Sequence, residues 1–300
     1  MRHVGDDNDV YLFGLLFYDL VFTGLPKPPT PGEELWTGGM ASGPGGIANF
    51  AVALARLGIR PVLAAAFGDD AHGTLCWDFL ADEGVDLTCS QRFADWATPV
   101  TVALSYDDDR ALITHGTPPP TLHTTTQESM PSTKASIVHL DPVADISVLD
   151  LPGLVFADVG WDPTQQWRPE LLRQLEHCHA FMPNEVEAMA YTRTETPRNA
   201  LKKLADVVPI AVVTRGARGA LAVDKLTGEH AEVDGINVDC VDSTGAGDVF
   251  GAAFVHATLT GMPLRERLQF ANKAAAISVQ RPGGATAAPT LPEIVGTVLA

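Results

Sequence analysis

The sequence predicts an α/β fold: a mostly parallel β-sheet covered by helices on both faces, with a small β-sheet lid. Two observations favour this fold. Short apolar runs typical of buried strands alternate with segments of helical periodicity, and two segments of the N-terminal half interrupt that alternation. The chain has 300 residues, 46 % of them hydrophobic, which is enough for a sizeable core. No convincing linker divides it, so we expect a single domain over residues 1–300.

The main sheet is expected from short apolar runs, and the helices from apolar residues that recur every three or four positions. In residues 47–57, Ile47, Phe50 and Leu54 fall on one helical face, and Gly58 stands where it would end the helix. The expected strands are residues 11–17, 62–67, 137–140, 154–157 and 210–214, and the other expected helices are 198–207, 246–259 and 264–279.

The lid is expected from the two segments that break the alternation. Residues 21–40 are rich in proline and glycine. In residues 98–115, Val100, Val102 and Leu104 alternate with polar or small residues, which predicts a two-stranded ribbon with one apolar face. We expect the lid to consist of about residues 17–42 and 97–116.

The net charge disfavours two classes of partner, nucleic acids and membranes. The formal net charge is −17, and a surface this acidic repels nucleic-acid phosphates and anionic lipid heads. An anionic ligand would therefore need Mg²⁺ and backbone N–H groups at its site. The N-terminus has no signal-peptide character, and the apolar run 10–22 is too short to span a bilayer and is interrupted by Asp19. We expect a cytoplasmic protein.

The four cysteines carry no metal signature. Cys76, Cys89, Cys178 and Cys240 are far apart and form no C-x-x-C pair. We expect buried, reduced thiols.

The stretch most informative about chemistry is residues 242–248, D-S-T-G-A-G-D, followed by an apolar run. Glycines at a helix start let a ligand approach the unpaired N–H groups of the first turn, which form an anion site with the helix dipole. A carboxylate there, Asp248, would suit a general base for phosphoryl transfer. The alternative is that Asp248 only caps the helix while Gly245 and Gly247 only form a turn. No Walker A sequence occurs, so a P-loop kinase is not supported.

These residues resemble the C-terminal signature of the PfkB (ribokinase-like) carbohydrate kinase family, D-[TS]-T-G-A-G-D, which is long and specific. Four further segments resemble family elements in the family's order. The resemblance implies a ribokinase-like three-layer α/β/α sandwich and an ATP-dependent carbohydrate kinase. The four segments are the glycine-rich turn and helix of residues 43–58, G-D-D-x-x-G at 68–73, P-N-x-x-E at 183–187 and the strand and glycine turn at 214–220.

The resemblance assigns the phosphoryl-transfer machinery. It implies that Asp248 is the catalytic base and that Gly245, Ala246 and Gly247 form the anion hole through their N–H groups. Asn184 and Glu187 match the residues that organise Mg²⁺ through its water shell, and oxygen ligands suit that ion. The alternative is an N-cap Asn with an ordinary surface Glu.

The resemblance also assigns the nucleotide and monovalent-cation contacts. The residues matched to ATP contacts are Thr214, Gly216, Gly219 and, near the adenine, Asn272. The residues matched to part of a potassium site are Asp242, Thr244 and Gly283.

Substrate contacts are implied for Asp19, Gly45, Gly46 and Asn49. Asp19 follows strand residues, where a buried carboxylate needs a partner that sugar hydroxyls would supply; the alternative is a structural Asp at a strand end. Asp141, after the strand 137–140, is a weaker candidate.

Two departures from ribokinase bear on the substrate. Where ribokinase has N-x-D, this chain has Phe17-Tyr18-Asp19, and a glycine pair, residues 45–46, stands where ribokinase has G-K. Ribose itself is therefore not the expected substrate. Residues 17–49 hold one cation, Lys27, which favours an unphosphorylated sugar with a hydroxymethyl group, fructose- or ribose-like, over a phosphosugar.

Two other functions stay open. Phe17 and the aromatic-containing stretch 93–96 suit a nucleoside, whose base needs a flat apolar slot. A non-catalytic sugar-binding regulator on the same fold is the third reading. Family lids often pair between subunits, so the resemblance also implies a homodimer through the lid.

Overall fold

The computed structural model describes residues 9–106, 109–122, 130–140 and 150–298. Its main sheet has eight strands in the order β14-β13-β12-β11-β10-β9-β1-β4. Neighbouring strands are parallel from β4 to β12, and β13 and β14 add an antiparallel edge. The strands are β1 (Val10–Phe13), β4 (Pro61–Ala64), β9 (Ala135–Leu140), β10 (Leu154–Val159), β11 (Ala180–Phe181), β12 (Ile210–Thr214), β13 (Ala220–Asp224) and β14 (Glu229–Val233).

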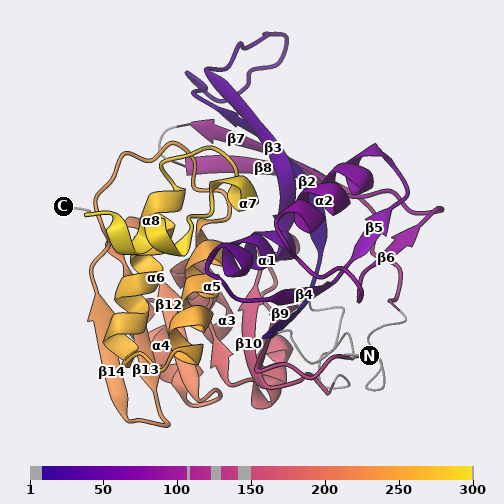
Figure 1. Cartoon of the computed structure of the whole chain (residues 1–300). Coiled ribbons are helices and arrows are strands. Elements are labelled where there is room, and N and C mark those ends of the chain that lie inside the picture. The colour runs from indigo at the N-terminus through magenta and orange to yellow at the C-terminus, as the bar shows by residue number, and fades with distance from the viewer. Residues whose placement is uncertain (1–8, 107–108, 123–129, 141–149, 299–300) are drawn as a thin grey trace.

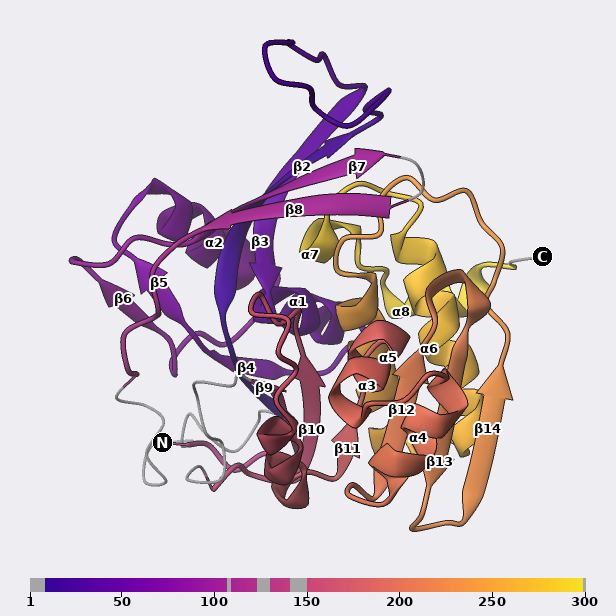
Figure 2. The ribbon, with the colours of Figure 1, turned by 180° about the vertical axis from the view of Figure 1, so that it is seen from behind.

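Helices cover both faces of this sheet. On one face lie α1 (Ile47–Arg56), α5 (Ala246–Leu259) and α6 (Leu264–Ser278), as Figure 1 shows. On the other face, seen in Figure 2, lie α3 (Glu185–Thr192) and α4 (Pro197–Ala205). Each face has its own apolar core. The predicted three-layer α/β/α sandwich is confirmed. The other helices within the described residues are α2 (Ala71–Asp82), α7 (Gly284–Ala287), α8 (Leu291–Gly296) and the 3-10 helices η3 (Pro169–His177) and η4 (Gly216–Arg218).

A second sheet of four strands projects from the main body (Figure 1). Its order is β3-β2-β7-β8, with β2 and β7 parallel at its centre. The predicted ribbon 98–115 corresponds to the antiparallel pair β7–β8. The strands are β2 (Leu16–Thr23), β3 (Gly39–Gly46), β7 (Val100–Tyr106) and β8 (Asp109–His115). We call this four-stranded sheet the lid.

Two predicted strands were wrong in their extent, because each divides between two sheets. Residues 11–17 break at Gly14, so that β1 stays in the main sheet and β2 enters the lid. A Cβ added at Gly14 would lie 3.1 Å from the Ile47 Cβ, so the chain passes close to α1 there. Residues 62–67 likewise divide into β4 and β5 (Ala66–Gly68), which pairs with β6 (Gln91–Phe93).

The cysteine prediction holds for three of the four thiols. Cys76, Cys89 and Cys178 are buried, Cys240 is exposed, and none of the four is in a disulfide. The prediction was wrong for Cys240 because this residue lies in the loop between β14 and α5 rather than in a core element. Two other predictions concern residues outside the described ranges: the substrate candidate Asp141 and the N-terminal residues 1–8.

No helix in the described ranges is both long and apolar enough to cross a membrane. The cytoplasmic location and the single-domain organisation stay predictions.

Candidate active site

The first turn of α5 is built as an anion-binding helix start. Gly245 precedes the helix with φ +71°, a left-handed conformation that favours glycine, and a Cβ there would lie 2.8 Å from the Gly284 Cα. The N–H of Ala246 donates to the Ser243 carbonyl at a long 3.3 Å. The N–H groups of Gly245, Gly247 and Asp248 have no backbone acceptor among the described residues. They are therefore available to an anionic ligand.

Asp248, in the first turn of α5, is held from two sides. Its Oδ2 accepts a hydrogen bond from Asn49 Nδ2 at 2.7 Å. Its Oδ1 lies 3.8 Å from His139 Nε2. Since no side chain caps the start of α5, the alternative reading of Asp248 as a simple helix cap finds no support in these contacts.

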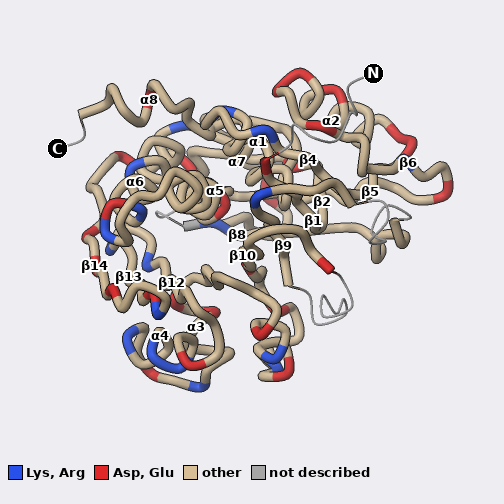
Figure 3. Tube along the Cα trace, turned by 60° about the horizontal axis from the view of Figure 1, so that its bottom comes forward, with Lys and Arg blue, Asp and Glu red and all other residues tan. Residues whose placement is uncertain are grey.

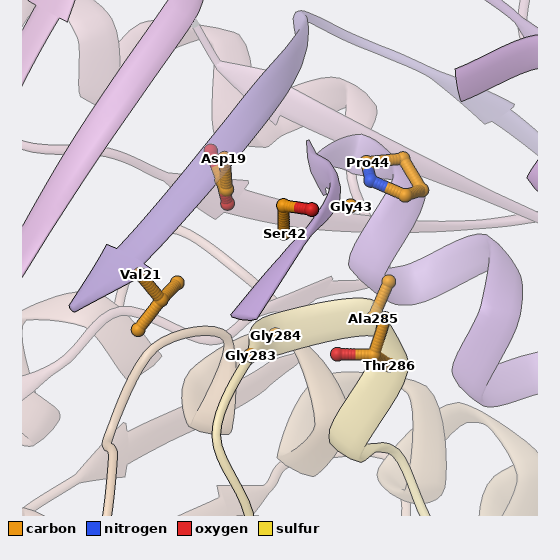
Figure 4. Close-up of a pocket in the computed structure, with 9 residues that line it drawn as sticks. All are labelled: Asp19, Val21, Ser42, Gly43, Pro44, Gly283, Gly284, Ala285 and Thr286. Atoms are coloured by element: carbon orange, nitrogen blue, oxygen red, sulfur yellow. The ribbon is translucent and has the colours of Figure 1, made fainter. Parts of the chain in front are cut away.

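Asp19 lies in the pocket drawn in Figure 4, between the lid and α7. The pocket is lined by Asp19 and Val21 of β2, by residues 42–44 of β3 and by residues 283–286. A Cβ at Gly45 would lie 1.9 Å from Asp19 Oδ2, so only glycine leaves room for this carboxylate. Gly46 has φ +63°, and a Cβ there would meet the Leu15 carbonyl oxygen at 2.4 Å. The two glycines thus shape the backbone beside Asp19.

The Asp19 carboxylate is buried without a hydrogen-bond donor among the described residues. It is 8 % exposed. Its pKa is raised to about 7, first by burial and also by the negative charges of Asp248 and Asp242, while Arg110 lowers it. Because Asp248 acts on its pKa, the two carboxylates share one electrostatic environment. A polyol donating to Asp19 would supply the missing partners.

Asn49 joins Asp248 to this pocket. The side chain of Asn49, in α1, is 3 % exposed. Its Oδ1 is buried and has no hydrogen-bond partner in the described structure, although its Nδ2 is used by Asp248. An unsatisfied buried acceptor beside a carboxylate base is a position for a donor of the substrate.

The three residues predicted to hold potassium are bonded to one another, because Thr244 and Gly283 both donate to the carboxylate of Asp242. Asp242 Oδ1 accepts from the backbone N–H of Thr244 at 3.0 Å and from its hydroxyl at 2.7 Å, and Oδ2 accepts from the Gly283 N–H at 2.8 Å. Asp242 is 3 % exposed. The lid also contacts this loop, since Ser105 Oγ donates to Asp242 Oδ1 at 3.4 Å. Among the described residues, the donors bonded to this buried carboxylate are neutral, an arrangement that fits a neighbouring monovalent cation.

Asn184 and Glu187 form a capping box at the start of α3. Asn184 Oδ1 accepts from the Glu187 N–H at 3.0 Å, and Glu187 Oε2 accepts from the Asn184 N–H at 3.1 Å. The alternative reading is thus right about the N-cap but wrong about a surface Glu, because Glu187 is 6 % exposed. Its pKa is raised to about 8, first by burial and also by Asp158 and Asp248, while hydrogen bonding with Asn184 lowers it. A dication beside Glu187 would offset these like charges, so the residues fit Mg²⁺.

The predicted nucleotide residues occupy two places. Thr214 ends β12, next to Asn184, with which it forms a β-bridge, and Gly216 and Gly219 follow it with φ +55° and +84°. Asn272 lies on α6, and its Nδ2 donates to the backbone carbonyl of Asp234 at 3.1 Å. The part of all four in nucleotide binding stays a prediction.

In the Cα trace of Figure 3, Lys and Arg positions recur along α4, α6 and the turns near β12–β14, and Asp and Glu positions are spread over the chain. Arg215 and Arg218 lie in the turn beside Gly216 and Gly219, and they bond Glu232 and Glu185 respectively. These two arginines are therefore paired with carboxylates of their own chain.

Sequence reasoning missed two residues of the site, His139 and Asp158. They are paired in register on the parallel strands β9 and β10. Together with Asp248 they form a group in which one side-chain nitrogen or oxygen atom from each residue lies within 4.8 Å of the others. The available signal was a single ionisable residue in each of two otherwise uncharged strands.

Comparison with known proteins defines the class. A model of the pfkB family of carbohydrate kinases matches residues 8–291. A ribokinase of Schizosaccharomyces pombe is 30 % identical over 292 residues, covering 90 % of this chain and 91 % of the relative. A fructokinase of Escherichia coli is 28 % identical over 281 residues, covering 84 % and 90 %. A solved structure of a putative ribokinase II from E. coli, in complex with ATP and Mg²⁺, has a TM-score of 0.77 at 22 % identity and covers 96 % of this chain and 98 % of that one.

The fold and these matches define an ATP-dependent carbohydrate kinase. The chain belongs to the pfkB family of carbohydrate kinases.

Proposed function

We propose that this protein transfers the γ-phosphoryl group of ATP to the hydroxymethyl group of a small unphosphorylated sugar, fructose- or ribose-like, with Asp248 as general base. The observation that carries the proposal is the Asp248–Asn49 pair. It sets a carboxylate beside available N–H groups of α5 on one side and beside an unsatisfied Asn49 oxygen on the other. A hydroxyl that reaches this pair is next to both a base and an anion site.

The transfer follows from this arrangement. Asp248 takes the proton of the sugar hydroxyl, whose oxygen forms a bond to the γ-phosphorus while the bond from that phosphorus to the bridging oxygen of ADP breaks. The N–H groups of Gly245, Gly247 and Asp248 would stabilise the charge on the phosphoryl oxygens. Asp19 and Asn49 Oδ1 would orient the sugar by accepting hydrogen bonds from its other hydroxyls.

Two cations complete the proposal. Asn184 and Glu187 would hold Mg²⁺ through its water molecules, and Mg²⁺ would neutralise charge on the ATP phosphates. Potassium would lie near the loop of Asp242, Thr244 and Gly283, where it would strengthen the positive field at the anion hole.

A nucleoside is the second candidate substrate, and one contact favours it. A Cβ added at Gly46 would lie 2.8 Å from the Phe17 Cδ2, so the Phe17 ring packs over a glycine beside the Asp19 pocket. An aromatic face at that position can stack on a nucleobase.

We further propose that the lid pairs two copies of the chain. The lid and the loop that joins its strands β2 and β3 expose large apolar side chains. Trp36 of that loop is 85 % exposed, and Ile113 and Met40 of the lid are 62 % and 61 % exposed. Sedimentation should show a dimer, and Ile113→Glu should shift it toward the monomer because a charge would be buried in the interface. A wild-type protein that is monomeric at all concentrations would contradict the pairing.

The function is tested by ADP release from MgATP, with and without K⁺, across neutral sugars, phosphosugars and nucleosides. Strong release with one neutral sugar, enhanced by K⁺, is the expected result. Release with a nucleoside alone would select the second candidate. ATP binding without ADP release from any compound would contradict a kinase acting on these classes.

A further inference from the structure

The register of two neighbouring strands places a histidine and a carboxylate side by side under the base. His139 of β9 is paired with Asp158 of β10 in a parallel ladder, so both side chains point to the same face of the sheet. Ile137 and Phe156, two residues earlier on each strand, belong to the core on the α1 and α5 side. His139 and Asp158 therefore point toward the layer that carries Asp248.

His139 is held in place by its neighbours. Its ring meets the Phe50 ring edge-on, with centroids 5.5 Å apart, and its side chain is 21 % exposed. Its Nε2 lies 3.8 Å from Asp248 Oδ1, while Asn49 bonds the other oxygen of that carboxylate. The base thus has one neutral contact and one contact that becomes ionic when the imidazole is protonated.

Among the described residues, the charged groups that act on His139 are two carboxylates. They are Asp158 from the adjacent strand and Asp248 from α5, and α1 contributes the uncharged Asn49 and Phe50. Burial lowers the pKa of His139, but the nearby carboxylate of Asp248, 3.8 Å from Nε2, and the charge of Asp158 outweigh burial and raise it. These neighbours therefore stabilise the imidazolium relative to the neutral ring.

The base needs such a partner because carboxylates crowd the site. Asp158 has its pKa raised to about 7, first by burial and also by the charge of Asp248, while His139 lowers it. Asp19 and Glu187 also have raised pKa values to which Asp248 contributes. Each of these negative charges disfavours ionisation of its neighbours.

We propose that His139 is the positioning residue of the base: held beside Asp158, its imidazolium pairs with Asp248 and keeps that carboxylate ionised and aimed at the substrate hydroxyl. The inference rests on the proposed role of Asp248 as general base. His139 itself touches neither the sugar nor the phosphate in this role. Its effect is on the fraction of Asp248 that is ready to accept a proton, and on the direction in which the carboxylate points.

The first test needs no substrate. In the full-length protein labelled with ¹³Cε1-histidine, the NMR signal lost in His139→Gln identifies His139. We expect that signal to titrate above the ordinary histidine value of 6.5 and to titrate at lower pH in both Asp248→Asn and Asp158→Asn. Glu176→Gln is the matched control, since Glu176 lies 3.4 Å from a different histidine, His177. A His139 signal that titrates identically in wild type and Asp248→Asn would overturn the pairing.

The second test is the pH profile of kcat/KM, with D-fructose and D-ribose as probes. In His139→Gln the acid limb should move to higher pH by about one unit, because a cation within 4 to 6 Å of a carboxylate favours its charged form. At its own optimum, kcat should fall about tenfold through loss of orientation, with the KM for ATP little changed.

The two failures are distinguishable. Near-normal turnover in Asp248→Asn would refute the proposed base, and with it the function of His139. Loss of turnover in Asp248→Asn together with a wild-type acid limb in His139→Gln would refute the positioning role alone. If neither sugar is phosphorylated, the NMR titration still decides whether the two side chains are coupled.

Discussion

At the scale of single residues, the site depends on close approaches that only glycine permits. Gly245 brings the start of α5 against Gly284 and Asn49, and Gly45 brings β3 against Asp19. These contacts join segments far apart in the sequence. The fit around Asp19 is the tighter of the two, because a Cβ at Gly45 would overlap the carboxylate itself.

The first prediction follows from this overlap. Gly45→Ala should displace Asp19 and raise the KM for the sugar about 10- to 100-fold, the loss of a hydrogen bond to a charged group, while ATP binding is retained. Steady-state kinetics and calorimetric titration with ATP measure both effects. The control is Gly296→Ala, where an added Cβ meets nothing within 4 Å. A wild-type sugar KM in Gly45→Ala would show that Asp19 does not contact the substrate.

At the scale of secondary structure, two helices begin with the same capping box but in different surroundings. Asn184 and Glu187 start α3 beside the carboxylates of the site, whereas Thr290 and Glu293 start α8, where Arg281 pairs with Glu293. The pKa of Glu293 is lowered to about 2, and that of Glu187 is raised to about 8. The same capping-box motif therefore has a glutamate of raised pKa in α3 and a glutamate of lowered pKa in α8.

The second prediction uses these two helices as a matched pair. Asn184→Ala and Thr290→Ala should each lower the free energy of unfolding by about 1 kcal/mol, because each removes an N-cap acceptor. Only Asn184→Ala should also raise the Mg²⁺ concentration needed for half-maximal turnover. Urea denaturation and Mg²⁺ titrations measure the two effects. If both variants need the same Mg²⁺ concentration for half-maximal turnover, Asn184 serves only as the N-cap of α3.

The sequence predicts the elements better than it predicts their contacts. Periodicity locates α1, α4, α5 and α6 within a few residues, and the D-S-T-G-A-G-D run locates the start of α5. The breaks at Gly14 and Ala65 escape prediction because the sheet that each half joins depends on partners elsewhere in the chain. The His139–Asp158 pair escapes it for the same reason, since strand register is a long-range property.

At the scale of the whole molecule, the site of this acidic protein gathers buried carboxyl groups whose ionisation is unfavourable. Burial and neighbouring charge raise the pKa of Asp19 to about 7, of Asp158 to about 7 and of Glu187 to about 8. A raised native pKa means that the folded chain binds these protons more tightly than the unfolded chain. The stability they contribute is complete below their unfolded values near 4 and is lost as pH rises through 7 to 8.

The third prediction is therefore a decline in stability above the acid range. Without ligand or Mg²⁺, the melting temperature should fall between about pH 5.5 and about pH 8, and MgATP should recover part of the loss at the higher pH. Below about pH 4, carboxylates with lowered pKa values, such as Asp9 and Glu293, reverse the trend. Calorimetry on Asp158→Asn should give a shallower decline than wild type. An unchanged slope would mean that Asp158 does not carry the effect.

The central claim is that Asp248 is the base of a sugar kinase, and Asp248→Asn tests it most directly. With the sugar that the wild-type protein phosphorylates, the rate of ADP release should fall by about 10²- to 10⁴-fold, the usual contribution of a general base. The affinity for ATP, measured by calorimetry, should stay close to wild type. The asparagine keeps the size of the side chain and removes its proton affinity. Turnover near the wild-type rate in this variant would contradict the account.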